Sequence, residues 1–182
     1  MTRLNIGSGC TRMEGFTNVD YVQVLDENGK PYTDVLCDIE KEKLPFEDNS
    51  VDEIACYETL EHLEDLIFAM NEMWRVLKPE GFLKGKVPRE GGRGAIADPT
   101  HKRVFITDTF DYFTGVNKHD SMRPTRPGNA DYGIKPWYKI SVDKNIRFVF
   151  RPRKTKEYNK DYERPELTHP IEIRDVSPRN NS

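Results

Sequence analysis

The chain has 182 residues, enough for one domain that buries roughly 70% of its unfolded surface without disulfides or metals. Its formal net charge is −3, and this mild acidity argues against a general nucleic-acid-binding surface. Apolar runs are too short for a transmembrane helix, no secretion signal is visible, and the three cysteines lack metal-ligand spacing. We therefore expect a soluble, cytoplasmic protein with reduced cysteines and no metal site.

The first half of the chain alternates predicted strands with connecting segments. Strands are expected at 3–7, 17–22, 34–39, 51–57 and 81–88. This alternation predicts a parallel sheet in an α/β fold. Ligands of such sheets bind beyond the carboxyl ends of the strands, so we expect the strand ends to converge on one crevice.

The clearest predicted element is a helix that begins after Thr59. Its apolar side chains recur at alternating spacings of three and four, which is one face of an α-helix: Leu60, Leu63, Ile67, Met70, Trp74 and Leu77. We expect Thr59 to cap the start of this helix, and Pro79 with Gly81 to end it. His62 is expected to cap or pack at its first turn.

The second half of the chain has weaker patterns. Residues 106–115 predict a helix, whereas 137–151 and 171–176 predict strands. Residues 116–136 are polar, rich in Gly and Pro, and without periodicity. A segment of this length in a compact domain is either a functional lid or a disordered loop, and both interpretations stay open.

The first predicted strand runs into LNIGSG, residues 4–9. A dinucleotide fingerprint would read Gly-x-Gly-x-x-Gly, but Arg12 stands where the third glycine would be. The chain also lacks the Gly-rich phosphate loop that ends in Gly-Lys followed by Ser or Thr. Taken alone, the Gly-x-Gly pattern is equally compatible with a tight turn after a strand.

Two aspartates extend the pattern that begins at the turn. A ligand with an adenosine and no phosphate needs bare backbone, a carboxylate for the ribose, and a polar group beside an apolar wall for the adenine. Gly7 and Gly9 supply the bare backbone, and Asp20 supplies the carboxylate for the ribose. Asp38 next to Ile39 supplies the polar group and the apolar wall for the adenine. Each aspartate alone is explained as a strand-end residue, but both in this order favour a nucleoside site.

These segments together resemble the small class I methyltransferases that use S-adenosylmethionine, of the type 11 methyltransferase domain. The resemblance covers residues 3–115 and is carried by LNIGSG, GFTNVDY, LPFEDNSVDEI, LEHL and RVLKPEG. It implies a Rossmann-like, doubly wound, mostly parallel seven-stranded sheet with an antiparallel last strand. One domain would span 1–182, with a cofactor-binding core at 1–115 and the last two strands within 137–176.

The resemblance also implies the contacts of the cofactor. The Gly-x-Gly turn would meet the methionine and ribose, and the acid of the second strand would hold the ribose. The acid of the third strand would face the adenine, and the end of the fourth strand would line the methyl-transfer position. The cofactor-binding residues implied are Gly7, Ser8, Gly9, Asp20, Tyr21, Asp38, Ile39, Tyr57 and Glu58.

Two features depart from the pattern of the family. The chain begins at its first strand, where larger relatives carry a helical cap, so we expect an N-terminally truncated core. Only residues 10–16 separate Gly9 from the second strand, which leaves room for at most two helical turns where a full crossover helix is usual. Substrate selection is then expected from segments later in the chain.

Methyl transfer from a sulfonium needs the nucleophile held close and in line, and a hydroxyl nucleophile also needs a base. His101 is the candidate base and Asp98 its orienting carboxylate, on a loop after the fifth predicted strand. The alternative is a helix-entry loop in which these residues hold structure.

Basic residues after the fifth predicted strand suggest the kind of acceptor. Arg89 and Arg93 lie beside three glycines, and Arg103 follows the candidate base. These arginines would suit an anionic acceptor such as a sugar acid or a phosphate ester. A solvated loop is the alternative.

The implied function is S-adenosylmethionine-dependent transfer of a methyl group to an oxygen or nitrogen atom of a small molecule, without nucleic acid or membrane. The alternative is a binding or degenerate core that serves as a subunit or scaffold and needs a partner, for which a homodimer is one form. A nicotinamide-dependent oxidoreductase is disfavoured, because the third glycine of its fingerprint is missing.

Overall fold

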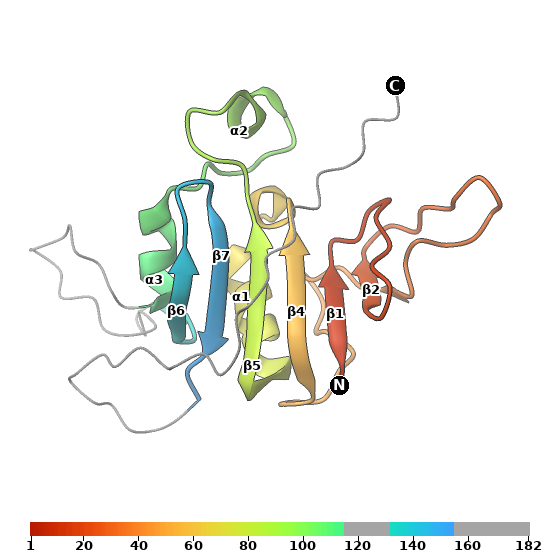
Figure 1. The fold of residues 1–182 in the computed structure, drawn as a ribbon, viewed down its shortest axis with the longest axis horizontal. Coiled ribbons are helices and arrows are strands. Elements are labelled where there is room, and N and C mark those ends of the chain that lie inside the picture. Colours follow the sequence, from red (N-terminus) through yellow and green to blue (C-terminus); the bar gives the residue numbers. More distant parts are fainter. Residues whose placement is uncertain (115–131, 155–182) are drawn as a thin grey trace, which may run out of the picture.

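The computed structural model describes residues 1–114 and 132–154, whose strands pair into one seven-stranded sheet (Figure 1). The strand order is β3-β2-β1-β4-β5-β7-β6. Neighbours from β3 to β5 are parallel, whereas β7 runs antiparallel to both β5 and β6. The strands are β1 (Arg3–Ile6), β2 (Thr17–Asp20), β3 (Val35–Leu36), β4 (Val51–Tyr57), β5 (Leu77–Lys86), β6 (Trp137–Val142) and β7 (Arg147–Pro152).

This sheet confirms the predicted Rossmann-like arrangement, with its mostly parallel strands and an antiparallel last strand in sequence. The carboxyl ends of the parallel strands lie at one edge of the sheet, the upper edge in Figure 1. The strand order reverses between β1 and β4, which is the point where open α/β sheets leave a crevice for ligands.

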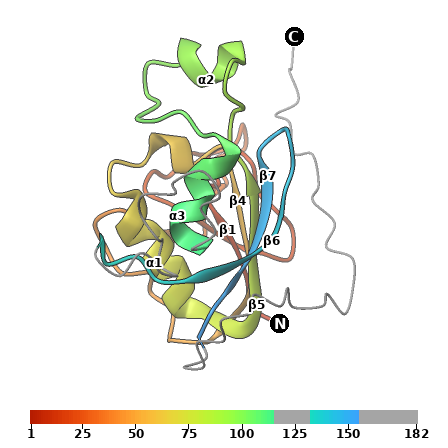
Figure 2. The same ribbon diagram turned by 90° about the vertical axis from the view of Figure 1, so that its left-hand side faces the viewer.

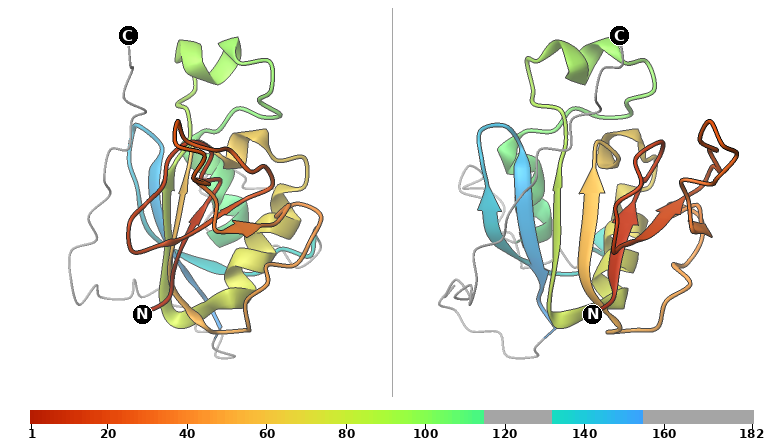
Figure 3. Two further views of the ribbon diagram at one scale, coloured as in Figure 1. Left: turned by 90° about the vertical axis from the view of Figure 1, so that its right-hand side faces the viewer. Right: turned by 45° about the vertical axis from the view of Figure 1, so that its right-hand side comes forward.

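Short helices complete the layers. α1 and α3 lie on the same face of the sheet (Figure 2), and α2 projects beyond the carboxyl edge (Figure 3). Within 1–114 and 132–154, no helix has the length and apolarity needed to cross a bilayer. The helices are the 3-10 helix η1 (Leu60–His62), α1 (Leu66–Val76), α2 (Arg93–Ala97), the 3-10 helix η2 (Thr107–Phe110) and α3 (Asp111–Thr114).

The helix predicted to begin after Thr59 begins later, at Leu66. The chain is extended at Leu63, where ψ is 132°, so the preceding residues form only the 3-10 turn η1. Asp65 caps α1 instead of Thr59, because its carboxylate accepts a hydrogen bond of 2.9 Å from the backbone N–H of Phe68. The turn η1 is therefore separate from α1, and its side chains point in directions that a continuous helix would not give them.

The strand predicted over 137–151 is wrong as a single element, because the chain turns back at 143–146 and forms β6 and β7. The Asp143 carboxylate accepts hydrogen bonds from the backbone N–H groups of Asn145 and Arg147, at 2.8 and 3.1 Å. Ile146 adopts a left-handed conformation with φ of 54°. The last two strands are thus one hairpin, and the strand expected at 171–176 lies outside the described residues, as does most of the segment 116–136.

The crossover from β1 to β2 is a loop, since residues 8–16 contain isolated turns but no helix. Leu4 belongs to the same buried apolar cluster as Met70 of α1. Arg3 alternates with Leu4 along the strand and stacks on the ring of Phe16, with 4.8 Å from its guanidinium carbon to the ring centroid. The loop therefore covers the face of the sheet opposite α1.

A buried hydrogen-bond network holds this loop. The Asn5 amide donates to the Thr11 carbonyl and to Asn18 Oδ1, at 3.0 Å each. Asn18 is fully buried, and both its backbone N–H and its side-chain amide donate to Asp34 Oδ2 at 2.9 Å. Burial raises the pKa of Asp34, but hydrogen bonds from Asn18 and Arg12 outweigh this and lower the pKa below its ordinary value.

We predict that Asn18→Ala lowers the free energy of unfolding by about 2–4 kcal/mol, because it leaves several buried polar groups without partners. Urea unfolding at neutral pH measures the change. Asn28→Ala, in an exposed turn, is the matched control and should leave the stability within about 0.5 kcal/mol of wild type. Equal stability of the two variants would contradict the structural role of the network.

Candidate active site

A cavity of about 530 Å³ lies at the carboxyl ends of β1, β2, β3 and β4. Seven of the nine residues implied for the cofactor line it: Gly7, Gly9, Asp20, Tyr21, Asp38, Ile39 and Glu58. Ser8 and Tyr57 are not among its described lining residues. Ser8 is buried, and its hydroxyl lies 3.4 Å from the Thr33 hydroxyl.

The turn after β1 brings bare backbone to this cavity. Gly7 and Gly9 have left-handed φ values of 73° and 49°, which favour glycine. A Cβ on Gly7 would lie 2.1 Å from the hydroxyl oxygen of Thr59, so a side chain does not fit at this position. The left-handed backbone and the close approach of Thr59, two residues after β4, thus both favour glycine at this position.

Asp20 connects the turn to the end of β2. Its Oδ2 accepts a hydrogen bond of 2.8 Å from the Gly9 N–H, and its Oδ1 accepts one of 3.1 Å from the Val22 N–H. A carboxylate offers about four lone-pair sites, so roughly two stay available toward the cavity. That capacity fits the two hydroxyls of a ribose.

The end of β3 supplies the polar and apolar groups expected around an adenine. Asp38 pairs with Lys41 at 2.7 Å, and both line the cavity. Ile39 and Cys37 are buried and form an apolar wall beside them, together with Leu63. The residues present therefore fit an adenosine group, and the cavity volume lies in the range of small-molecule sites.

A second cavity, of about 400 Å³, shares Glu58 with the first. Lys86, Arg89 and Arg147 line it, which gives it a basic character. Glu58 has φ of 47°, an uncommon conformation for a residue other than glycine, and its carboxylate lies 3.1 Å from the Lys86 ammonium. Backbone strain of this kind clusters at functional sites. Glu58 is also the residue at which the two cavities meet, because it lines both of them.

The three arginines proposed for the acceptor lie in different places. Arg89 lines the second cavity, whereas Arg93 is exposed on α2. Arg103 donates to the backbone carbonyls of Leu63 and Glu64, at 2.6 and 2.8 Å. Its contacts fasten the loop that carries the candidate base to the segment between η1 and α1.

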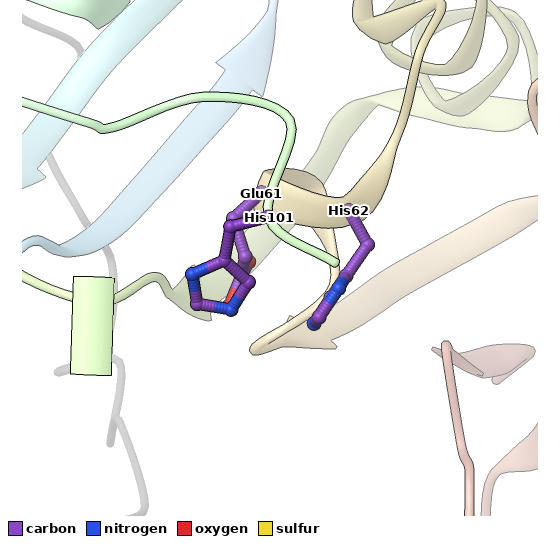
Figure 4. Close-up of side chains that lie close together, drawn as sticks. All are labelled: Glu61, His62 and His101. Atoms are coloured by element: carbon purple, nitrogen blue, oxygen red, sulfur yellow. The ribbon is translucent and has the colours of Figure 1, made fainter. Parts of the chain in front are cut away.

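The candidate base lies in a cluster of titratable side chains. The rings of His101 and His62 are 4.7 Å apart, and His101 Nε2 lies 3.8 Å from Asp98 Oδ2, which is too long for a hydrogen bond. Glu61 lies behind His101 (Figure 4) and is 1% exposed. Burial raises the pKa of Glu61 to about 8, and the nearby carboxylates of Glu58 and Asp98 add to this rise.

Sequence reasoning missed Glu61 as a site residue. The sequence suggested only a charge in the first turn of a regular helix, whereas Glu61 is buried in the 3-10 turn η1. Its position directly before His62 in LEHL was the only available signal.

Comparisons with known proteins agree with this geometry. Residues 11–84 match the model of a family described as a methyltransferase domain. A search with the whole sequence against curated proteins finds no significant match.

Three solved structures are similar. A methyltransferase described as dependent on S-adenosylmethionine, from Archaeoglobus fulgidus, is 21% identical over 61% of this chain and 57% of its own, with a TM-score of 0.47. One described as putative, from Methanococcus maripaludis, is 16% identical over 87% and 80%, with a TM-score of 0.46. A chain of the complex between the Trm112 methyltransferase activator and a methyltransferase described as putative, from Haloferax volcanii, is 23% identical over 48% and 45%, with a TM-score of 0.35. The chain thus spans about half the length of the first and the third.

Proposed function

Because the chain carries a class I methyltransferase domain, whose cofactor is S-adenosylmethionine, we propose that it transfers a methyl group to an oxygen or nitrogen atom of an anionic small molecule. The observation that supports this most is the pair of cavities that share Glu58. One cavity has the residues that suit a nucleoside, and the other has basic side chains.

We place the cofactor in the first cavity. The backbone of Gly7 and Gly9 would lie against its methionine and ribose, Asp20 would accept hydrogen bonds from the ribose hydroxyls, and Asp38 with Ile39 would hold the adenine. When bound, S-adenosylmethionine supplies a methyl group on a sulfonium, which is already activated for in-line displacement. The task left to the protein is to hold the acceptor atom close to that methyl and aligned with it.

We place the acceptor in the second cavity. The side chains of Lys86, Arg89 and Arg147 lie there. Lys86 pairs with Glu58 and Arg147 with Asp143, so Arg89 would contribute most to attracting a carboxylate or a phosphate. Such a group would anchor the acceptor at a fixed distance from Glu58, where the two cavities meet. The acceptor cavity therefore favours small organic acids and phosphate esters over neutral compounds.

His101 is the residue we propose as the base for a hydroxyl or protonated amine acceptor. Its side chain is 8% exposed, and its Nδ1 lies 3.3 Å from the carbonyl of Ala95, which lines the second cavity. If Nδ1 carries the proton of this contact, the lone pair of Nε2 is left to accept a proton. Asp98, at 3.8 Å from Nε2, would stabilise the resulting cation.

A core that needs a partner is the second candidate function. β3 is a two-residue strand at the edge of the sheet, and Leu36 on it is 57% exposed. Tyr21, which lines the cofactor cavity, is 73% exposed. Exposed apolar side chains beside an open sheet edge favour contact with another chain.

The test is turnover by the purified chain. We expect S-adenosylhomocysteine to form from S-adenosylmethionine in the presence of an anionic member of a panel of hydroxy acids, sugar acids, phosphate esters and their neutral analogues. Binding of S-adenosylhomocysteine without turnover would support the partner-dependent core. Neither binding nor turnover would overturn the proposed cofactor site.

We predict that Asp20→Ala weakens S-adenosylhomocysteine binding by about 1.5–3 kcal/mol, or roughly 10- to 150-fold in Kd, because hydrogen bonds to a charged group are lost. Isothermal titration calorimetry measures the change. Asp26→Ala is the matched control, because Asp26 also accepts two backbone N–H bonds but lies in an exposed turn. Unchanged affinity of folded Asp20→Ala would contradict the ribose assignment.

Arg89→Gln tests the acceptor cavity. We expect the KM for the anionic acceptor to rise about tenfold or more, because a charge-assisted hydrogen bond is removed, while the Kd for S-adenosylhomocysteine stays as in wild type. Arg93→Gln removes an arginine from the same segment outside the cavity and should change the KM less than about twofold. Similar KM values for the two variants would place the acceptor elsewhere.

A further inference from the structure

We propose that Glu61, His62 and His101 form a binding site for a divalent first-row transition-metal ion, which was not expected from the sequence. Each side chain offers one ligand atom, and the three atoms lie within 4.8 Å of one another (Figure 4). Atoms bound to one ion at about 2.1 Å lie at most about 4.2 Å apart. Side-chain rotations that bring the atoms together by about 0.5–1.5 Å would therefore complete the site.

The Glu61 side chain is the strongest indication of a ligand. It is 1% exposed, neither of its carboxylate oxygens has a hydrogen bond of normal geometry among the described residues, and its carboxylate neighbours Glu58 and Asp98 repel its charge. A buried carboxyl group stays neutral unless a positive group compensates its charge, and a bound metal ion is such a group. The two histidines are the nitrogen donors that lie closest to completing such a site.

The hydrogen bonds of the two histidines leave the same nitrogen available in each. Thr100 Oγ1 donates to Asp98 at 2.6 Å, so its lone pair accepts the Nδ1–H of His62 at 2.9 Å. The Nδ1 of His101 faces the Ala95 carbonyl at 3.3 Å and carries its proton there. Histidines that bind metals almost always donate their other N–H to an oxygen in this way, which leaves Nε2 to the metal.

Backbone contacts hold the two segments of the site together before any ion binds. The backbone N–H of Lys102 donates to the Glu61 carbonyl at 2.8 Å, and the Lys102 ammonium pairs with Glu64 at 2.7 Å. Arg103 adds the bonds to the carbonyls of Leu63 and Glu64. His101 is thereby fixed beside the η1 turn that carries the other two ligands.

The donor set indicates the kind of ion. Two imidazoles and one carboxylate favour zinc, iron, manganese or cobalt over calcium and magnesium, which prefer oxygen ligands. Three protein ligands leave positions open for a further oxygen atom. His62 lines the first cavity and Ala95 the second, so such an ion would lie between cofactor and acceptor.

The role of the ion in methyl transfer rests on the proposed function. Binding of the ion to the three side chains does not depend on that function. An acceptor hydroxyl bound to the ion would lose its proton more readily, because the ion lowers the pKa of oxygen ligands. The ion would occupy the Nε2 lone pair of His101, and would thus take over the task of the base. The open position would also orient the acceptor oxygen.

Cobalt titration tests the site without cofactor or acceptor. The full chain, with the exposed Cys10 changed to Ser to exclude a thiolate ligand, is stripped with a chelator and titrated with Co²⁺ and with Zn²⁺. We expect visible Co²⁺ absorption that saturates at one ion per chain, and a rise of the melting temperature with Zn²⁺. Absence of both in the folded protein would overturn the proposal.

Glu61→Gln and Glu80→Gln form a matched pair for this test. Glu61→Gln preserves the size of the side chain and leaves the backbone bond from Lys102 in place, so it should fold, and we expect it to bind Co²⁺ at least tenfold more weakly. Glu80→Gln changes an exposed carboxylate on β5, away from the site, and should bind as wild type. Equal binding by both variants would overturn the assignment.

His101→Gln is the second ligand variant and should also lose Co²⁺ binding at least tenfold, while retained binding would contradict its place in the site. Calorimetry with S-adenosylhomocysteine on the same samples separates the two proposals. A variant that loses Co²⁺ binding but keeps S-adenosylhomocysteine binding supports the metal site alone. If the cofactor proposal is wrong, the wild-type chain itself will not bind S-adenosylhomocysteine.

Discussion

The hydrogen bonds among Asn5, Asn18 and Asp34 are the constraint on which the site depends. In α/β folds the first crossover is usually a helix, whose packing fixes the turn before it and the strand after it. Here a short loop takes its place, and the buried amides of Asn5 and Asn18, together with the Asp34 carboxylate, hold it against β1 and β2. Since the Gly7–Gly9 turn begins this loop and Asp20 ends β2, their mutual position is set by polar contacts.

The charges of the site are divided between its two cavities. Acidic side chains at the ends of β2 and β3 face the place proposed for a positively charged sulfonium cofactor, and basic side chains surround the place proposed for an anionic acceptor. Glu58, strained and paired with Lys86, lies at the boundary. The electrostatic potential of each cavity would therefore be complementary to its own reactant, the cofactor or the acceptor, and unfavourable to the other.

The sheet and most of the residues that line the first cavity could be predicted from the sequence, because strand ends and the Gly-x-Gly turn are local patterns. β4 was predicted with its bounds. The start of α1 was not, because Leu60 in the 3-10 turn and Leu63 directly after it are both buried at helical spacing, although the chain is extended at Leu63 and α1 begins only at Leu66. The cluster of Glu61, His62 and His101 could not be predicted either, since it depends on a tertiary contact between η1 and a distant loop.

The position of β7 also bears on how the chain reaches its fold during synthesis. β5 pairs with β4 on one side, but its second neighbour, β7, is available only after residues 87–152 have been made, because β7 inserts between β5 and β6. Until then the growing chain presents the β5 edge with unpaired backbone groups, which is the kind of surface on which chains associate wrongly. During synthesis on the ribosome, the parallel strands would thus be made before the β6–β7 hairpin that completes the sheet. A chaperone would matter most in the time between the synthesis of β5 and that of β7.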